Sequence, residues 1–316
     1  MKRYVVIGNS IAAAGCVEGI RSADPEGTIT VVSEENHPAY CRPLISYFLD
    51  GRASLERISY RAPDFYDKAG CTVLYGRRAA AIKPEEKAVE LDDGSFLPYD
   101  ALCVATGSSP FVPKMEGLEN VKNKFSFMTL DDAVELDKFV TKDTRVLVVG
   151  AGMIGLKCAE GLLGRAASVT VVDLADRVLS SVLDFECAAL IQRRLEEHGM
   201  RFYLSDSAAR FDADTAYLKS GAVVGFDALV LAVGIRPNVS IVRDAGGEVD
   251  RGIVVDDRQR ASLQGVFAAG DCAQSFDVSS GASKVLAILP NADLLWFSSS
   301  QHTCLLGFLL FPISAN

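Results

Sequence analysis

The apolar positions of this chain form short runs, and two of these runs are followed by the same pattern of small residues. The first run spans residues 4–7 and leads into a glycine loop at 8–13, and the second spans 146–149 and leads into a glycine loop at 150–155. Each loop precedes a helical spacing of apolar residues and then another apolar run, the second of which closes on Asp173. A buried strand, a tight turn, a helix and a second strand make a βαβ unit. The pattern therefore predicts two such units.

Both loops contain the residue types that let a backbone approach a pyrophosphate. The first glycine permits the turn, a small second residue leaves room for the phosphates, and a small third residue lets helix and strand pack closely. The phosphates then lie on the N–H groups at the start of the helix. The second loop matches this pattern fully, whereas Ser10 and Ala13 replace two glycines of the first. One loop could be an ordinary strand–turn–helix without a ligand, but two favour two bound dinucleotides.

The rest of the chain supplies elements that complete two α/β domains. We expect a loop and a short helix at 38–51, a β-meander at 72–98, a buried strand at 101–105, a linker at 108–125, helices at 129–140 and 184–198, and buried strands at 226–233 and 265–271. The last strand cannot build a core alone and should return to the first domain. The predicted fold class is α/β, with two Rossmann-like three-layer domains, a discontinuous one with a β-meander and one inserted into it.

Composition and charge narrow the classes of function. With 316 residues, of which 49% are apolar, the chain can form two domains with cores. Its net charge of −9 and pI of about 5.0 argue against binding to nucleic acid. The eight cysteines form no Cys-x-x-Cys pair and the three histidines lie far apart, so we expect neither a metal site nor a dithiol redox motif.

Two features of the chain ends indicate where the protein works. The chain enters a strand directly after Met1-Lys2-Arg3, without the pattern of a signal peptide, which favours a cytoplasmic protein. The apolar run at 305–311 is shorter than the ~20 residues that span a bilayer. We therefore expect no association with a membrane.

Four motifs in this order resemble the FAD-dependent pyridine nucleotide-disulfide oxidoreductase family over roughly residues 1–292. They are the two glycine loops, the strand end Ala105-Thr106-Gly107 and the turn Gly270-Asp271. The resemblance implies an FAD-binding domain at 1–110 and 237–292 and an NADH-binding domain at 111–236. Within the family, residues 40–46 are similar to the Arg-Pro loop of ferredoxin, rubredoxin and nitrite reductase-type flavoproteins, whose Arg and Pro line the FAD.

The loops and the resemblance together indicate the cofactor-binding residues. For FAD they are Gly8, Ser10, Ile11, Ala12, Ala13, Glu34, Arg42, Pro43, Ala79, Ala105, Thr106, Gly107, Gly270 and Asp271. For NADH they are Gly150, Gly152, Met153, Ile154, Gly155, Asp173 and Gly234. In the family the late Gly-Asp turn holds the ribityl chain, although Asp271 could instead cap a following helix.

Asp173 bears on the choice between NADH and NADPH. Its position, 23 residues after Gly150, is close to the spacing expected for an acid that binds the ribose 2′-hydroxyl. A carboxylate there would repel the 2′-phosphate of NADPH, so we expect NADH to be preferred. The nearby Arg177 is the alternative, because an arginine can accept that phosphate.

Lys157 and Tyr47 are the candidate catalytic residues. Many relatives place a lysine after the serine of the Arg-Pro loop and pair it with a glutamate on the helix that follows the second glycine loop. This chain has Tyr47 and Lys157 at those two positions. We expect Lys157 to point toward N5 of the flavin, perform electrostatic stabilisation of the reduced flavin, and hydrogen-bond to the phenol of Tyr47. The alternative is a surface lysine on an exposed helix face.

The resemblance implies an NAD(P)H-dependent FAD oxidoreductase that passes hydride from NADH to flavin. Electrons then leave to a small rubredoxin- or ferredoxin-like protein or to a small-molecule acceptor. A thiol-dependent NADH oxidase or disulfide reductase is an alternative that would use Cys41. However, Cys41 lies two places before the position of the redox cysteine in that branch, and Arg42 follows it instead of glycine.

The end of the chain departs from the family pattern. Residues 289–292 resemble the start of the last flavin-contacting helix, after which relatives continue into an interface domain that builds their dimer. Residues 293–316 match no such domain, and we expect this atypical tail to leave apolar surface uncovered. A truncated flavin- or nucleotide-binding protein without turnover is therefore a further alternative.

Overall fold

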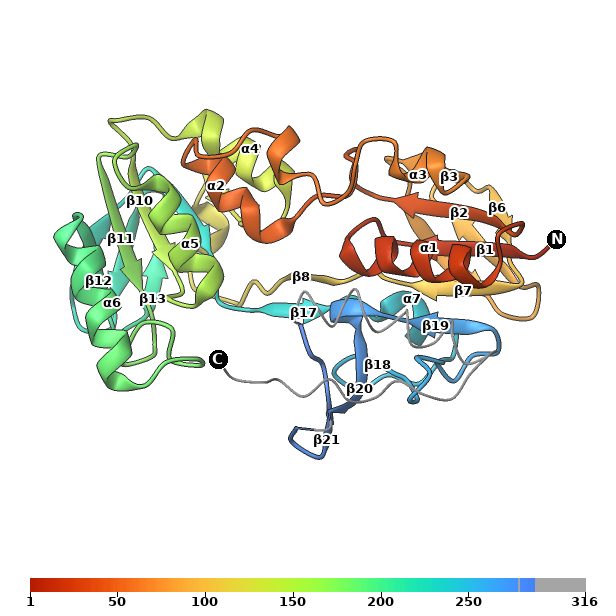
Figure 1. Cartoon of the computed structure of the whole chain (residues 1–316). Coiled ribbons are helices and arrows are strands. Elements are labelled where there is room, and N and C mark those ends of the chain that lie inside the picture. Colours follow the sequence, from red (N-terminus) through yellow and green to blue (C-terminus); the bar gives the residue numbers. More distant parts are fainter. Residues whose placement is uncertain (278, 288–316) are drawn as a thin grey trace, which may run out of the picture. The chain divides into compact units, whose positions relative to one another are not determined.

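The computed structural model describes residues 1–277 and 279–287, which form two compact units (Figure 1). The first unit contains residues 1–40, 60–108 and the described residues from 237 onward. The second unit contains residues 41–59 and 109–236. The expected tail at 293–316 and the expected helix start at 289–292 lie outside the described residues. Among the described residues, no helix combines the length and apolar character needed to cross a membrane.

The first unit is built on a five-stranded parallel sheet with the order β19-β7-β1-β2-β3. Its strands are β1 (Arg3–Ile7), β2 (Thr28–Ser33), β3 (Cys71–Tyr75), β7 (Ala101–Val104) and β19 (Val266–Ala268). Val6 belongs to the cluster that packs on helix α1 (Ile11–Ala23), whereas Val5 and Ile7 face the meander. Alternate residues of a strand point to opposite faces, so this continuous apolar run is buried on both sides and makes three layers.

Smaller elements complete this unit. The meander contains β4 (Ala79–Lys83), β5 (Ala88–Leu91) and β6 (Phe96–Pro98), and the remaining elements are α3 (Phe65–Lys68), α7 (Ser240–Arg243), β18 (Ile253–Val254), β20 (Ala273–Asp277) and β21 (Ala282–Lys284). β19 pairs in parallel with β7, so a strand from the last part of the chain completes a sheet begun at residue 3.

The second unit repeats this architecture with a sheet in the order β12-β11-β10-β16-β9. Its strands are β9 (Lys124–Phe125), β10 (Arg145–Val149), β11 (Ser168–Val172), β12 (Met200–Tyr203) and β16 (Ala228–Leu231). Its helices are α2 (Ile45–Leu49), α4 (Leu130–Phe139), α5 (Met153–Leu162) and α6 (Phe185–Glu197), and its meander is β13 (Ala208–Phe211), β14 (Thr215–Leu218) and β15 (Val223–Gly225). Leu147 and Val149 of β10 pack on that meander. The predicted fold class is confirmed.

The central strand of each unit begins at the same kind of ion pair. Arg3 opens β1, and its backbone N–H and guanidinium donate to Asp100, which directly precedes β7. Arg145 opens β10 and makes the same three hydrogen bonds to Asp227, which directly precedes β16. A fork-shaped guanidinium that binds both carboxylate oxygens fixes the register of the two strands it joins.

Two segments differ from their predictions. The expected linker at 108–125 contains β8 (Ser108–Pro110), which pairs with β17 (Ile235–Pro237), and also β9, which pairs with β16 at the sheet edge. Short strands of this kind carry little apolar signal and form only because a neighbouring strand is present. The meander at 208–225 lies in a stretch for which we made no prediction.

Residues 41–59 also differ from the predicted boundary, which placed them within 1–110. They pack in the second unit, where α2 lies against α4 and α5. Gly161 allows this approach, because a Cβ atom there would lie 3.1 Å from the carbonyl oxygen of Ser46. Arg165 fastens the segment by donating to the carbonyl of Leu49 and pairing with Asp137 of α4 at 2.6 Å.

We predict that the Arg145–Asp227 pair stabilises the fold in a pH-dependent way. The hydrogen bonds from Arg145 lower the pKa of Asp227 to about 2 from an ordinary value of 3.8. The stabilisation is therefore present above pH 3.8 and is lost as the pH falls toward 2. Asp227→Ala should lower the free energy of unfolding by about 1 kcal/mol at pH 7, because the pair is largely exposed. Urea unfolding from pH 2 to 7 measures this, and an undiminished difference from the parent at pH 2 would contradict the prediction.

Candidate functional site

The first glycine of each loop occupies a place that no other residue could fill. Gly8 has φ +114° and Gly150 has φ +116°, a region that favours glycine. A Cβ atom on Gly8 would lie 2.1 Å from the carbonyl oxygen of Ala105, and one on Gly150 would lie 2.2 Å from that of Ala232. Each of these alanines directly follows the strand next to the loop. The two loops are therefore the same structure built twice.

The helices that follow begin without a capping side chain. Ser10 is the N-cap of α1 but its hydroxyl makes no capping hydrogen bond, and Gly152 is the N-cap of α5. Ile11 and Ala12 are buried in the first turn of α1, while Met153 and Ile154 begin α5. The N–H groups at both helix starts therefore lack a side-chain acceptor from the cap, the arrangement that receives a phosphate.

The third position of the motif separates the two loops. A Cβ atom on Gly155 would lie 2.0 Å from the carbonyl oxygen of Gly150, so helix α5 packs against its loop more closely than any side chain allows. In the first unit Ala13 stands at this position and is fully buried. Its methyl group requires a wider spacing between α1 and its loop, as the sequence suggested.

Asp173 is held against the second glycine loop. Its carboxylate accepts hydrogen bonds from the N–H of Ala151 at 2.5 Å and of Ala175 at 2.7 Å. In the first unit the residue in register with Asp173 is the buried Ser33, and Glu34 is exposed one place later. The acid predicted for FAD is thus one residue further along the chain than the acid predicted for NADH.

Arg177 is engaged by its own loop. Its Nε donates to the carbonyl of Leu183 at 3.1 Å, its Nη2 donates to the carbonyl of Ser180 at 3.2 Å, and its Nη1 pairs with Asp176 at 2.8 Å. The guanidinium is therefore committed to nearby oxygens, which makes it a poor candidate to receive the 2′-phosphate of NADPH.

The predicted ribityl aspartate lies at the carboxyl end of the first sheet. Asp271 is half-buried in a single 3-10 turn, where its carboxylate accepts a hydrogen bond from the hydroxyl of Ser108 at 3.1 Å. Gly270 before it has φ +78°. The element that follows is the strand β20 and not a helix, so Asp271 is not a helix cap.

The strand end before it is joined to the returning chain. The hydroxyl of Thr106 donates to the carbonyl of Asn238 at 2.8 Å, and the Asn238 amide donates back to the carbonyl of Thr106 at 2.8 Å. Gly107 and Gly234 both have positive φ, at +63° and +124°. Ala79, the remaining predicted residue, opens β4 in the meander.

The Arg-Pro loop is part of the second unit. Arg42 donates to the carbonyl of Met128 at 3.0 Å, and Pro43 is exposed beside it. Cys41 is half-buried, and burial raises the pKa of its thiol. Reactive cysteines have a lowered pKa, so this environment does not favour a thiolate at Cys41.

Lys157 and Tyr47 do come together, with an additional acid. The ammonium of Lys157 lies 5.0 Å from the centre of the Tyr47 ring, and the guanidinium of Arg52 lies 4.4 Å from it. Lys157 donates to Glu160 at 2.6 Å, and Arg52 lies 3.6 Å from the same carboxylate. The contact between Lys157 and the tyrosine is therefore a cation–π contact with the ring. Sequence reasoning missed Glu160, although an acid three residues after a helical lysine is a recognisable pair.

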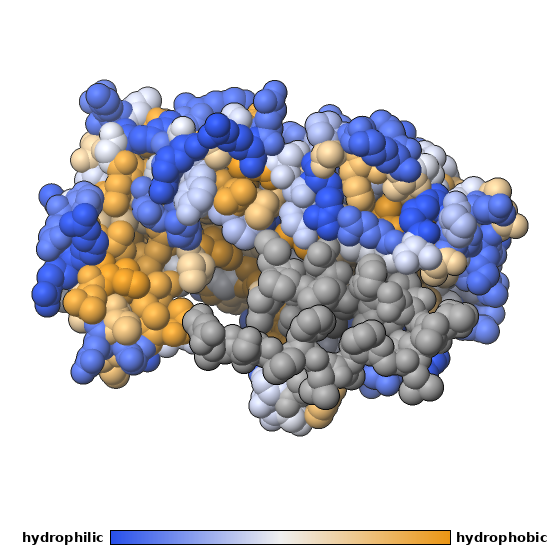
Figure 2. All heavy atoms as spheres, viewed as in Figure 1, coloured by the Kyte–Doolittle hydropathy of each residue, from blue (hydrophilic) through white to orange (hydrophobic). Residues whose placement is uncertain are grey.

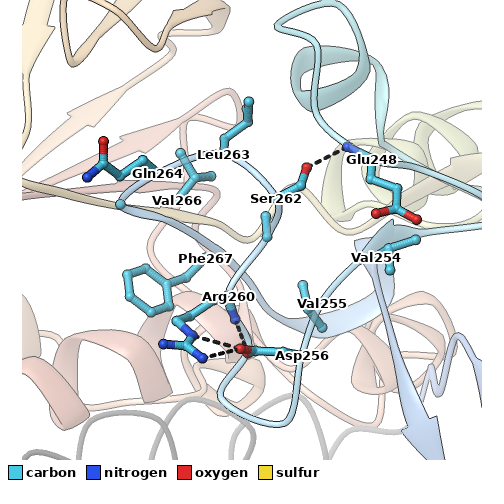
Figure 3. A pocket seen from close by; sticks show the side chains of 12 residues that line it. Glu248, Val254, Val255, Asp256, Arg260, Ser262, Leu263, Gln264, Val266 and Phe267 are labelled. Atoms are coloured by element: carbon cyan, nitrogen blue, oxygen red, sulfur yellow. Dashed lines mark hydrogen bonds and ion pairs between the residues drawn. The ribbon is translucent and has the colours of Figure 1, made fainter.

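A depression of about 580 Å³ in the first unit contains none of these residues (Figure 3). It lies between residues 248 and 267, where Arg260 pairs with Asp256 and the Ser262 hydroxyl accepts from the Glu248 N–H. Its polar groups are largely engaged with one another, so we do not assign it a ligand. Among the described residues, no cluster of His, Cys, Asp or Glu side chains could hold a metal ion.

We predict that the first and second glycines of the NADH loop respond differently to alanine. Gly150→Ala forces a methyl group onto the Ala232 carbonyl at a left-handed φ and should cost about 1–3 kcal/mol of stability. Gly152→Ala is the matched control, because φ is −77° there and no atom lies within 4 Å of the added carbon. Thermal unfolding measures both variants. Equal melting temperatures would show that the close approach at Gly150 is not needed.

Comparisons with known proteins agree with this geometry. The chain matches the family described as pyridine nucleotide-disulphide oxidoreductase over residues 2–291. It is 32% identical over 298 residues to the NADH-dependent phenylglyoxylate dehydrogenase subunit epsilon of Aromatoleum evansii, covering 92% of this chain and 70% of that protein. It is 33% identical over 278 residues to the assimilatory nitrate reductase electron transfer subunit of Bacillus subtilis, covering 86% of this chain and 36% of that protein.

A solved structure extends the likeness to three dimensions. A chain of the covalent putidaredoxin reductase–putidaredoxin complex has a TM-score of 0.89 at 26% identity, covering 96% of this chain and 75% of that one. The family match covers both glycine loops, the Arg-Pro loop and the Gly270-Asp271 turn. The resemblance predicted from the sequence is confirmed, and the chain belongs to the pyridine nucleotide-disulphide oxidoreductase family.

Proposed function

We propose that this protein is an FAD-dependent oxidoreductase that takes hydride from NADH and passes electrons to a small redox protein or another acceptor. The observation that carries the proposal is the duplicated loop, in which Gly8 and Gly150 have the same φ and the same close contact with a neighbouring strand. The loop of the first unit would bind FAD and that of the second would bind NADH. FAD supplies the redox chemistry when bound, and the protein supplies binding and orientation.

The relatives support this class of reaction. Their names describe an NADH-dependent dehydrogenase subunit, an electron transfer subunit and a reductase solved with its putidaredoxin partner. This chain spans only about a third of the second relative, so the acceptor is a proposal. We propose a small iron–sulfur or rubredoxin-like protein as that acceptor, and residues 1–110 with 237–292 and residues 111–236 as the FAD and NADH domains.

We propose that NADH is preferred over NADPH. Asp173 presents a carboxylate at the second loop, where it favours ribose hydroxyls and repels a phosphate. Arg177 does not offset this repulsion, because Ser180 and Leu183 accept from its guanidinium. Comparable kcat/KM values for the two cofactors would contradict this preference.

The free thiols support a cytoplasmic location. The cysteines at 16, 41, 71, 103, 158, 187 and 272 form no disulfide. Reducing compartments keep cysteines in this form. The thiol-dependent alternative gains no support from them, because burial raises the pKa of Cys41.

We predict that Asp271→Ala yields protein with depleted flavin. The carboxylate is half-buried at the carboxyl end of the first sheet, where it can accept a hydrogen bond from a ribityl hydroxyl. The parent should show a flavin spectrum and oxidise NADH with a dye acceptor, while the variant loses both in parallel. Asp257→Ala, an exposed acid of the same unit, is the control. Full flavin occupancy in Asp271→Ala would refute the assignment, and a flavin-loaded parent without NADH oxidation would favour a protein without turnover.

We propose Lys157 as a catalytic residue and Tyr47 as its partner, with the ammonium stabilising the negative charge of the reduced flavin. Glu160 lies at 2.6 Å and fixes the direction of the ammonium. Lys157→Met should lower the flavin reduction potential and slow its reduction by NADH about tenfold or more. Lys157→Arg should restore part of both, and Lys138→Met, an exposed lysine on α4, should change neither. An unchanged potential and rate in Lys157→Met would show that Lys157 is a surface residue.

A further inference from the structure

We infer that Arg177 is a positioning residue that holds the loop at 174–184 in the form that binds the adenosine end of NADH. This loop joins β11 to α6 and follows Asp173 directly. The inference rests on the proposed function, which assigns NADH to the second glycine loop.

Every nitrogen of the Arg177 guanidinium has a partner on this loop. Nε and Nη2 donate to the carbonyls of Leu183 and Ser180, and Nη1 pairs with Asp176. The flat guanidinium also lies 4.3 Å from the centre of the Phe185 ring, at the first residue of α6. One side chain therefore joins both halves of the loop and the start of the following helix.

The loop is also attached to the phosphate-binding turn. The N–H of Leu179 donates to the carbonyl of Ala151 at 2.9 Å, while the N–H of Ala151 donates to the carboxylate of Asp173. Leu179 has φ +51°, an unfavourable conformation for a residue with a side chain. Such a conformation persists only where its surroundings impose it. The hydrogen bonds from Arg177 to residues on the far side of Leu179 provide that constraint.

The shape of the loop also decides which surface it presents. Leu174 is 73% exposed, Val182 is 62% exposed and Phe185 is 64% exposed, and Met153 stands exposed at the start of α5. Figure 2 shows apolar surface gathered on the second unit around α5 and α6. A carboxylate for ribose hydroxyls beside apolar side chains suits a nucleoside. That match depends on a loop held in place before the ligand arrives.

The planar shape of arginine is essential to this role. A guanidinium donates in several fixed directions, whereas a lysine ammonium is a single charge on a flexible stem. Arg177→Lys would keep the positive charge but could not reach both carbonyls and Asp176 together. The Lys variant therefore separates a bracing role from simple attraction of a negatively charged cofactor.

The test compares Arg177→Lys and Arg177→Gln with the parent in the FAD-loaded protein. The Kd for NAD⁺ is measured by titration calorimetry, and kcat for NADH is measured with a dye acceptor. Both variants should bind NAD⁺ about tenfold more weakly, the effect of one or two hydrogen bonds, with kcat within about twofold of the parent. NADP⁺ binding should weaken by a similar factor. Arg194→Gln is the control, because this arginine lies exposed on α6 and pairs only with Glu197 among the described residues.

Three outcomes would overturn the inference. NAD⁺ affinity in Arg177→Lys equal to that of the parent would show that no brace is needed. Selective loss of NADP⁺ binding in Arg177→Gln would make Arg177 a phosphate receptor. A parent that binds no NAD⁺ would overturn the proposed function and this inference together.

A second variant carries the test if the Arg177 variants do not fold. Leu179→Gly accepts the left-handed φ without strain, so its melting temperature should equal or exceed that of the parent. It nevertheless loosens the loop, and NAD⁺ should bind several-fold more weakly. Unchanged affinity would show that the loop need not be held in shape.

Discussion

The fold depends on a close contact between the first glycine of each loop and the carbonyl that follows the neighbouring strand. At Gly8 and Ala105, and again at Gly150 and Ala232, the backbones approach within a distance that excludes a side chain. This contact brings a strand end, a helix start and the next connecting segment to one point. Because N–H groups at a helix start carry partial positive charge, the same point becomes an anion site. The architecture and the binding site thus arise from one constraint.

The opposite ends of the same strands are fixed by charge. Arg3 with Asp100 and Arg145 with Asp227 close the amino ends of the two sheets with identical sets of hydrogen bonds. The units therefore agree wherever the backbone must be held. They differ at positions that face a ligand or set a helix spacing, as Ser33 differs from Asp173. Two sites of one design can in this way select different dinucleotides.

Local patterns predicted the parts of the fold whose signals are local. The helix at 130–139 begins at a capping box between Thr129 and Asp132, and both glycine loops carry their own signature. The meander at 208–225 carries no such signature, because its strands are short and bury Phe211 and Leu218 only once the sheet covers them. The packing of residues 41–59 in the second unit depends on contacts of Gly161 and Arg165, far away in sequence. No local pattern could have revealed either feature.

The two departures at Tyr47 and Lys157 are best understood as one change. α2 and α5 pack together, so the side chains at 47 and 157 are neighbours that must be compatible. A lysine at both positions would place like charges side by side, which is unfavourable. With a tyrosine at 47, the ring receives Lys157 and Arg52 on its electron-rich surface, and Glu160 balances both cations. The acid that relatives carry at position 157 has a counterpart at Glu160, almost one helical turn later, so the segment retains a cation and an acid with their order on the helix changed.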